Sequence, residues 1–373
     1  MDNKKNITVR QSNFELMRII SMFMIVLWHV IFHTNMFYNT SGTTGYIIEF
    51  IYLIIIVHVN SYVLVTGYFQ YNKKIKPKKI WGLIGSVWFY NILFTFIAMA
   101  FKLQKINKVE FLENTSILNI NSYWFINYYI ILYVLSPFLN KMIFSLKQSE
   151  HRRLILILYV AFSIIPTITK QRTLENTGLS IISFIFLYLL GAYFGKYKIK
   201  DSYHFKRNSN IKNGTIFFSL FLLFGIIGFV FYRFGLDLIK SDNIILNDFG
   251  QTITMSATTF SAPIIILESV FYFLFFETIS IQSNFIGKIS KFMFGVYLVH
   301  ENYYVCNNIY KIKQLNLYSN EPIVIIRAIL TSIVIFFISI IIEMIRKFIS
   351  KLIFNTKAMK KLEQKYDKIV KEF

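Results

Sequence analysis

The sequence predicts an all-α fold, a polytopic integral membrane bundle of about ten transmembrane helices. Of the 373 residues, 55% are hydrophobic, and the mean hydropathy is +0.51. This composition is more apolar than that of soluble domains. Apolar runs of about 18 or more residues recur along the chain, and each is long enough to cross a hydrocarbon core about 30 Å thick. No soluble domain of useful size is expected.

We expect ten spans, each close to the length that a bilayer requires. The polar stretch 236–256 is predicted to be a loop. The spans define a transmembrane domain over residues 1–350, and a basic amphipathic tail over residues 351–373 is expected in the cytoplasm or at the membrane surface. The limits of the spans are 15–35, 46–69, 80–101, 123–140, 153–169, 179–195, 214–234, 257–280, 286–305 and 323–345.

Basic residues lie between the apolar runs and predict the orientation of the bundle. They follow the second, fourth and sixth spans, at 73–79, 141–153 and 196–212. With a cytoplasmic N-terminus, the cytoplasmic segments hold 30 of the 40 Lys and Arg residues, and the outer loops hold 9. Cytoplasmic loops of membrane proteins are enriched in Lys and Arg. We therefore expect a multi-pass protein of the cell membrane with both termini in the cytoplasm.

The net charge of +21 is explained by the same loops. Basic loops face anionic lipid headgroups, and the sequence has no motif that binds DNA or RNA, so membrane lipids and not nucleic acids are the expected partners. The single cysteine, Cys306, excludes an intramolecular disulfide. The first apolar run lacks a small-residue cleavage site, so we expect it to be a retained helix and not a signal peptide.

The first span carries two polar residues, Arg18 and His29, that hydrocarbon penalises. Eleven helical residues return to within about 20° of the starting direction and rise about 16 Å, so the two side chains share one helix face. Arg18 alone fits an anchor at the cytoplasmic boundary. His29 lies within the span, where its side chain either faces a polar cavity or forms a structural hydrogen bond to another helix. The pair alone supports a functional and a structural role equally.

In the first span, within "NFELMRIISMFMIVLWH" (13–29), an arginine is followed by ten residues and then by a histidine. This pattern resembles the signature of the membrane-bound acyltransferase-3 family, whose members O-acylate carbohydrates. The loop after the second span is lysine-rich here and arginine-rich in the family, and no appended extracytoplasmic hydrolase-like domain is found. Other stretches resemble family segments in the same order: "VNSYVLVTGYF" (59–69), "NKKIKPKKI" (72–80), "YWFINYYIILYVLSPFLN" (123–140), "LLGAYFGKY" (189–197) and "GKISKFMFGVYLVH" (287–300).

The resemblance implies acetyl-CoA, or another acyl-CoA, as the co-substrate on the cytoplasmic side. CoA is a polyanion and requires basic groups where it docks. An acceptor hydroxyl attacks a thioester poorly unless a base removes its proton, and imidazole suits this task. We therefore predict His29 as the general base, and we expect no metal because no cluster of ligands is apparent. The candidate partners of the CoA phosphates are Arg18, Lys73, Lys74 and Lys76, together with Lys78 and Lys79.

Six further residues are candidates for binding the acceptor or supporting the base. Each has a structural alternative: an interhelical hydrogen bond for an intramembrane histidine, a paired or protonated state for a membrane carboxylate, and the interfacial aromatic belt for Trp124. Glu268 could orient a histidine or Arg327. The candidates are His300, Glu301, Tyr297, His58, Glu268 and Trp124.

The predicted function is that of a bacterial O-acyltransferase, most simply an O-acetyltransferase. Its acceptor would be a surface polysaccharide of the capsule or cell wall, or a lipid-linked precursor. The alternative is a flippase or exporter of a lipid-linked sugar, with His29, Glu268 and Arg327 as a relay. In a third interpretation the polar residues only join helices. The acceptor sugar, the acyl chain, the side of transfer, an acyl-enzyme intermediate and a homo-oligomeric state stay open.

Overall fold

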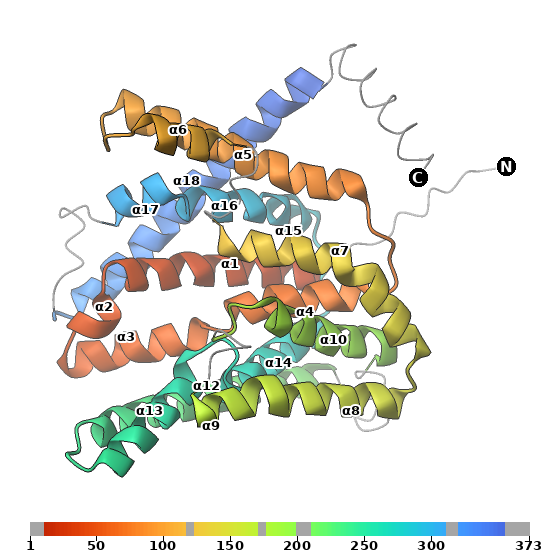
Figure 1. Cartoon of the computed structure of the whole chain (residues 1–373), viewed down its shortest axis with the longest axis vertical. Coiled ribbons are helices and arrows are strands. Elements are labelled where there is room, and N and C mark those ends of the chain that lie inside the picture. Colours follow the sequence, from red (N-terminus) through yellow and green to blue (C-terminus); the bar gives the residue numbers. More distant parts are fainter. Residues whose placement is uncertain (1–10, 117–122, 171–176, 199–209, 311–319, 355–373) are drawn as a thin grey trace.

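The described part of the protein is built of helices (Figure 1). The computed structural model describes residues 11–116, 123–170, 177–198, 210–310 and 320–354. No strand occurs in these ranges, which confirms the predicted all-α class. The helices are α1 (Ser12–His33), α2 (Met36–Asn39), α3 (Gly42–Ile55), α4 (His58–Gln70), α5 (Pro77–Ala100), α6 (Lys108–Thr115), α7 (Trp124–Ser145), α8 (Gln148–Tyr159), η1 (Val160–Ile164), α9 (Ile165–Thr169), α10 (Ile181–Tyr197), α12 (Asn210–Ile239), α13 (Ile244–Thr258), α14 (Pro263–Thr278), α15 (Asn284–Ile289), η3 (Ser290–Phe292), α16 (Met293–His300), α17 (Tyr303–Ile309) and α18 (Ile323–Phe354).

Eight helical segments of the described chain are long and apolar enough to cross a membrane, and they coincide with eight of the ten predicted spans. The sixth predicted span is α10, a shorter apolar helix, and the ninth is divided among α15, η3 and α16. Residues 351–354 continue α18, whereas residues 355–373 of the predicted tail lie outside the described residues. The helices indicate a multi-pass membrane protein.

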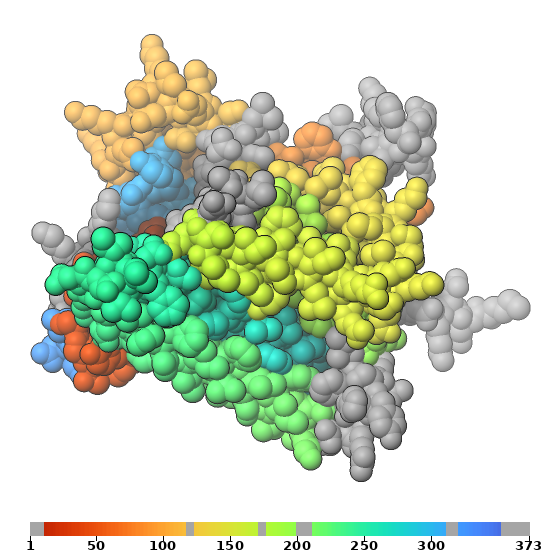
Figure 2. All heavy atoms as spheres, turned by 60° about the horizontal axis from the view of Figure 1, so that its bottom comes forward, coloured from red at the N-terminus to blue at the C-terminus, as the bar shows by residue number. Residues whose placement is uncertain are grey.

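The surface of the bundle has the apolar character that lipid requires. Figure 2 shows the face formed by α8, α12 and α13. Large apolar side chains point outward from these helices, where water would penalise them and hydrocarbon would not. Among them are Leu156, Ile157, Leu223, Ile226, Val230 and Phe249.

The prediction of a loop over 236–256 is wrong, because α12 extends to Ile239 and α13 begins at Ile244. The Asn243 side chain caps α13 by accepting hydrogen bonds from the backbone N–H groups of the next turn. Gly250 allows close contact with α12, since a Cβ there would lie 2.7 Å from the carbonyl oxygen of Gly235. The polar side chain of Asp248 is 71% exposed. The loop prediction failed because it used the average polarity of the segment, which does not distinguish a loop from a helix that packs on one side only.

Two of the spans are interrupted, and the interruptions meet inside the bundle. The second span breaks between α3 and α4, and the eighth breaks between α13 and α14, at residues 259–262. Asn60 Nδ2 donates to the carbonyl oxygen of Phe260 at 2.8 Å, and Ser163 Oγ donates to that of Ser261 at 2.6 Å. Such irregular backbone is tolerated at membrane depth where protein groups satisfy it. The two breaks bring His58 and Phe260 together.

Helix α1 lies in the middle of the bundle (Figure 1). It packs against α3 and α4 near the start of the described chain and against α14, α15, α16 and α18 near its end. Met17, Val26 and Val30 of α1 are fully buried in the two main apolar clusters. Consequently, a polar side chain of α1 faces other helices or a space between them, and not lipid.

The contact between α4 and α10 generates the first prediction. A Cβ at Gly191 would lie 2.1 Å from the carbonyl oxygen of Leu64, so the backbones must separate in Gly191→Ala. Overpacking of this kind costs about 1–3 kcal/mol. We expect a lower midpoint of thermal unfolding in detergent. The control is Gly82→Ala, because nothing lies within 4 Å of a Cβ at this position of α5. Equal midpoints for the two variants would contradict the close packing.

Candidate active site

Arg18 and His29 line one cavity of about 460 Å³. The cavity is bounded by α1, α4, α5, α7 and α16, and by Phe260 from the break before α14. Because eleven helical residues rise about 16 Å, the cavity extends over roughly that length of α1. The shared helix face expected from the sequence is thus the wall of a single internal space. We name its two ends the basic end, at Arg18 and Lys79, and the histidine end, at His29, His33 and Glu301.

His29 is held at the histidine end by the end of α16. Its Nδ1 lies 3.0 Å from His300 Nε2 and 3.0 Å from Glu301 Oε2. His300 Nδ1 lies 2.6 Å from the carbonyl oxygen of Val296. A carbonyl only accepts hydrogen bonds, so Nδ1 of His300 carries the proton and Nε2 is an acceptor.

The proton of neutral His29 is placed by these contacts. Since His300 Nε2 and the Glu301 carboxylate both accept, His29 Nδ1 must donate. Its Nε2 therefore keeps a free lone pair, and no described residue hydrogen-bonds this atom. An imidazole oriented by a carboxylate, with its other nitrogen free, is the arrangement of a general base.

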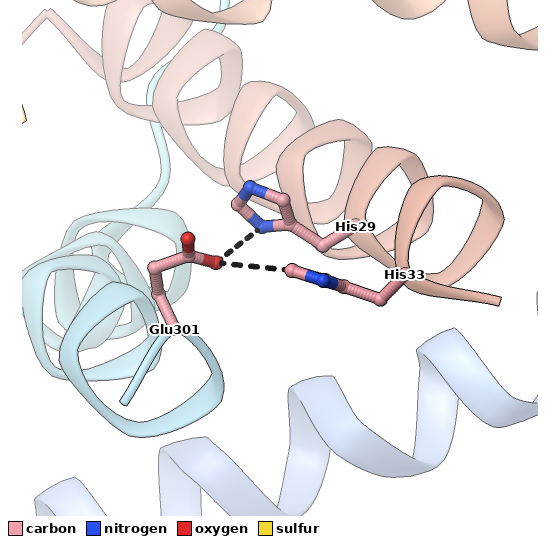
Figure 3. A group of neighbouring side chains, drawn as sticks. All are labelled: His29, His33 and Glu301. Atoms are coloured by element: carbon pink, nitrogen blue, oxygen red, sulfur yellow. Dashed lines mark ion pairs between the residues drawn. The ribbon is translucent and has the colours of Figure 1, made fainter. Parts of the chain in front are cut away.

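His33 completes the polar group at this end (Figure 3). It follows His29 by one helical turn, and its Nε2 lies 4.0 Å from Glu301 Oε2. The His33 ring stacks on Tyr310 with the centroids 4.8 Å apart, and its side chain is 27% exposed. His33 is not among the residues predicted from the sequence, although it follows His29 by four residues.

The basic end contains fewer of the predicted lysines than expected. Lys79 lines the cavity, donates to the Tyr129 hydroxyl at 2.9 Å and lies 4.2 Å from the centroid of the Tyr133 ring. Burial lowers the pKa of the Lys73 ammonium, and the nearby charges of Arg18, Lys79 and Lys76 lower it further. These four cations therefore form one electropositive group.

Lys73, Lys74, Lys76 and Lys78 are all exposed, and none of them lines the cavity. The backbone N–H of Lys76 donates to the Tyr133 hydroxyl at 3.0 Å. Among the five lysines of residues 73–79, Lys79 is thus the only one that lines the cavity. Sequence alone could not separate it from its neighbours, because all five lysines fit a cytoplasmic loop equally.

The middle of the cavity is aromatic. His58 packs edge-on against Trp28 and Phe260, with both pairs of ring centroids 5.8 Å apart. Neither ring nitrogen of His58 has a hydrogen-bond partner among the described residues. Trp124 also lines the cavity, and its ring lies 6.4 Å from that of Phe260. The candidates His58 and Trp124 therefore lie between the two ends.

The remaining candidates lie in different places. Tyr297 lines the cavity. Glu268 is fully buried away from the lining, and within the described residues neither carboxylate oxygen has a hydrogen-bond partner. The expected pairing of Glu268 with a histidine or with Arg327 is absent there. Asn302, which follows Glu301, donates to the Tyr123 hydroxyl at 3.0 Å and caps α17.

Comparison of the sequence with models of known protein families identifies the family of this chain. The acyltransferase-3 family model, described as an acyltransferase domain, matches residues 11–344. No curated protein and no solved structure matches the chain significantly. The matched segment runs from the start of α1 into α18 and includes every residue that lines the cavity. The chain therefore belongs to the acyltransferase-3 family and is a transferase of acyl groups.

Proposed function

We propose that the protein transfers an acyl group, most simply acetyl, from acyl-CoA to a hydroxyl of a carbohydrate. The acceptor would be a surface polysaccharide or its lipid-linked precursor. The observation that carries this proposal is the single cavity that joins a group of cations to an oriented histidine. The cations suit a polyanionic donor, and the oriented histidine suits a hydroxyl acceptor. The reaction requires that the two substrates meet in one connected space.

The distribution of charge supports an orientation in the cell membrane. The segments that are cytoplasmic when the N-terminus is inside hold 30 of the 40 basic residues. In that orientation the basic end opens toward the cytoplasm, where acyl-CoA is found. The phosphates would contact Arg18, Lys79 and Lys73, and the thin pantetheine arm would extend along the aromatic middle of the cavity toward His29.

The reaction can be written with the groups at the histidine end. His29 Nε2 takes the proton of the acceptor hydroxyl while the hydroxyl oxygen attacks the carbonyl carbon of the thioester. The carbon–sulfur bond then breaks, and the CoA sulfur leaves with the proton from His29. Glu301 stabilises the transient imidazolium and fixes the ring, as the carboxylate of a catalytic triad does. No described hydroxyl or thiol hydrogen-bonds His29, which favours direct transfer over an acyl-enzyme.

Replacement of His29 tests the proposal in cells. We expect His29→Ala to lower the acylation rate about 10²–10⁴-fold, because the oriented imidazole that takes the proton of the acceptor is lost. The measurement is proton NMR of surface polysaccharide from deletion cells complemented with each variant at equal membrane abundance. The control is His151→Gln, since His151 is buried outside the cavity against the Leu189 carbonyl.

O-acyl signals should vanish with His29→Ala and persist with the control, at an unchanged amount of polymer. If the polymer itself disappears while its acyl content per repeat is normal, the alternative of a flippase or exporter is correct. Among the described residues, the proposed relay for transport lacks a hydrogen bond between His29 and Glu268.

The basic end makes a separate prediction. Lys79→Ala should raise the KM for acyl-CoA about 10- to 100-fold, since a charge-assisted hydrogen bond contributes about 1.5–3 kcal/mol. Lys74→Ala is the matched control from the same basic segment and should leave KM near its wild-type value. Initial rates of the purified enzyme over a range of acyl-CoA concentrations provide the measurement. Equal KM values for the two variants would place the CoA phosphates elsewhere.

Glu301→Gln should show the opposite pattern. The amide preserves the shape of the side chain but removes the charge that stabilises imidazolium, so kcat should fall about 10- to 100-fold. The KM for acyl-CoA should stay close to wild type, because Glu301 lies at the far end of the cavity from Lys79. A raised KM with unchanged kcat would show that Glu301 binds the donor instead of orienting the base.

A further inference from the structure

The histidine end has the composition of a metal-binding site. His29 and His33 project from one face of α1, and Glu301 meets them from the end of α16 (Figure 3). One donor atom from each residue can be chosen so that all three atoms lie within 4.8 Å of one another. Two histidines four residues apart on a helix, joined by a distant carboxylate, are a known way to bind zinc.

The distances agree with a shared ion after small movements. Zinc binds imidazole nitrogen and carboxylate oxygen at about 2.0–2.2 Å, so two donors on one tetrahedral ion lie about 3.3 Å apart. Here His29 Nδ1 is 3.0 Å from Glu301 Oε2, and His33 Nε2 is 4.0 Å from the same oxygen. Binding of a shared ion would require His33 Nε2 to move closer to Glu301 Oε2.

His300 supplies an independent observation. Its Nε2 lies 3.0 Å from His29 Nδ1, while its Nδ1 donates to the carbonyl oxygen of Val296 at 2.6 Å. Histidines that bind metals usually donate their second ring N–H to a carbonyl or carboxylate, which fixes the tautomer. His300 Nε2 therefore presents a lone pair beside His29 Nδ1, although it is not among the three donor atoms that lie within 4.8 Å of one another.

We propose that His29, His33 and Glu301 bind a divalent zinc-like ion that inhibits acyl transfer. This proposal rests on the proposed function, in which His29 Nε2 is the base. An ion on Nδ1 confines the single proton of the neutral ring to Nε2. That nitrogen then has no lone pair for the acceptor hydroxyl. No step of the proposed reaction involves this ion, which acts instead as a reversible block.

Zinc binding to the purified, full-length protein tests the site without reference to activity. Equilibrium dialysis in detergent, followed by metal analysis, should find one zinc ion per wild-type chain. His33→Ala and Glu301→Gln should bind at least tenfold more weakly, because each removes one donor. His151→Gln, which alters a buried histidine outside the group, should bind like wild type. Thermal unfolding without zinc verifies that each variant is folded.

Wild-type protein that binds no zinc, or a folded His33→Ala variant that binds it equally, would overturn the site and leave the proposed function standing. Acyl transfer provides the second readout, with each variant scaled to its own rate in chelator. Added zinc should inhibit wild type as the site fills, chelator should restore the rate, and His33→Ala should need at least tenfold more zinc. Full activity with zinc bound would contradict both the block and the role of His29 as base.

Discussion

The hydrogen bond from His29 Nδ1 to the end of α16 is the interaction on which the site depends. It joins the central helix α1 to His300 and Glu301, which are distant in sequence. Polar groups within a membrane are costly unless they are paired, so the partners hold each other firmly in place. The same bond determines which nitrogen of His29 is protonated. The same hydrogen bond therefore fixes both the packing of α1 against α16 and the protonation of the His29 ring.

The rest of the bundle creates a space in which that orientation is useful. The breaks at residues 56–57 and 259–262 place His58 and Phe260 in the middle of the cavity. Two uninterrupted helices would have packed directly against each other and filled this space. At the other end, Arg18 and Lys79 concentrate positive charge beside aromatic hydroxyls. The cavity thus has a basic end, an aromatic middle and an oriented imidazole, and α1 contributes to each of them together with other helices.

Helix geometry was sufficient to predict that Arg18 and His29 share a face, because that relation is local in sequence. It could not show that Glu301 would meet His29, since this contact depends on how α16 packs against α1. Nor could it select Lys79 from a uniformly basic loop. The error at 236–256 arose because average polarity conceals the packed side of α13, whose contact with α12 is tertiary.

The most direct measurement is a cryo-electron microscopy structure with a non-hydrolysable acyl-CoA analogue, prepared in chelator. The account predicts phosphate density beside Arg18 and Lys79, pantetheine density along Trp124 and Phe260, and the acyl carbonyl near His29 Nε2. A donor bound outside the cavity, or bound inside it with its phosphates at the histidine end, would contradict the claim that one cavity joins the donor to the base.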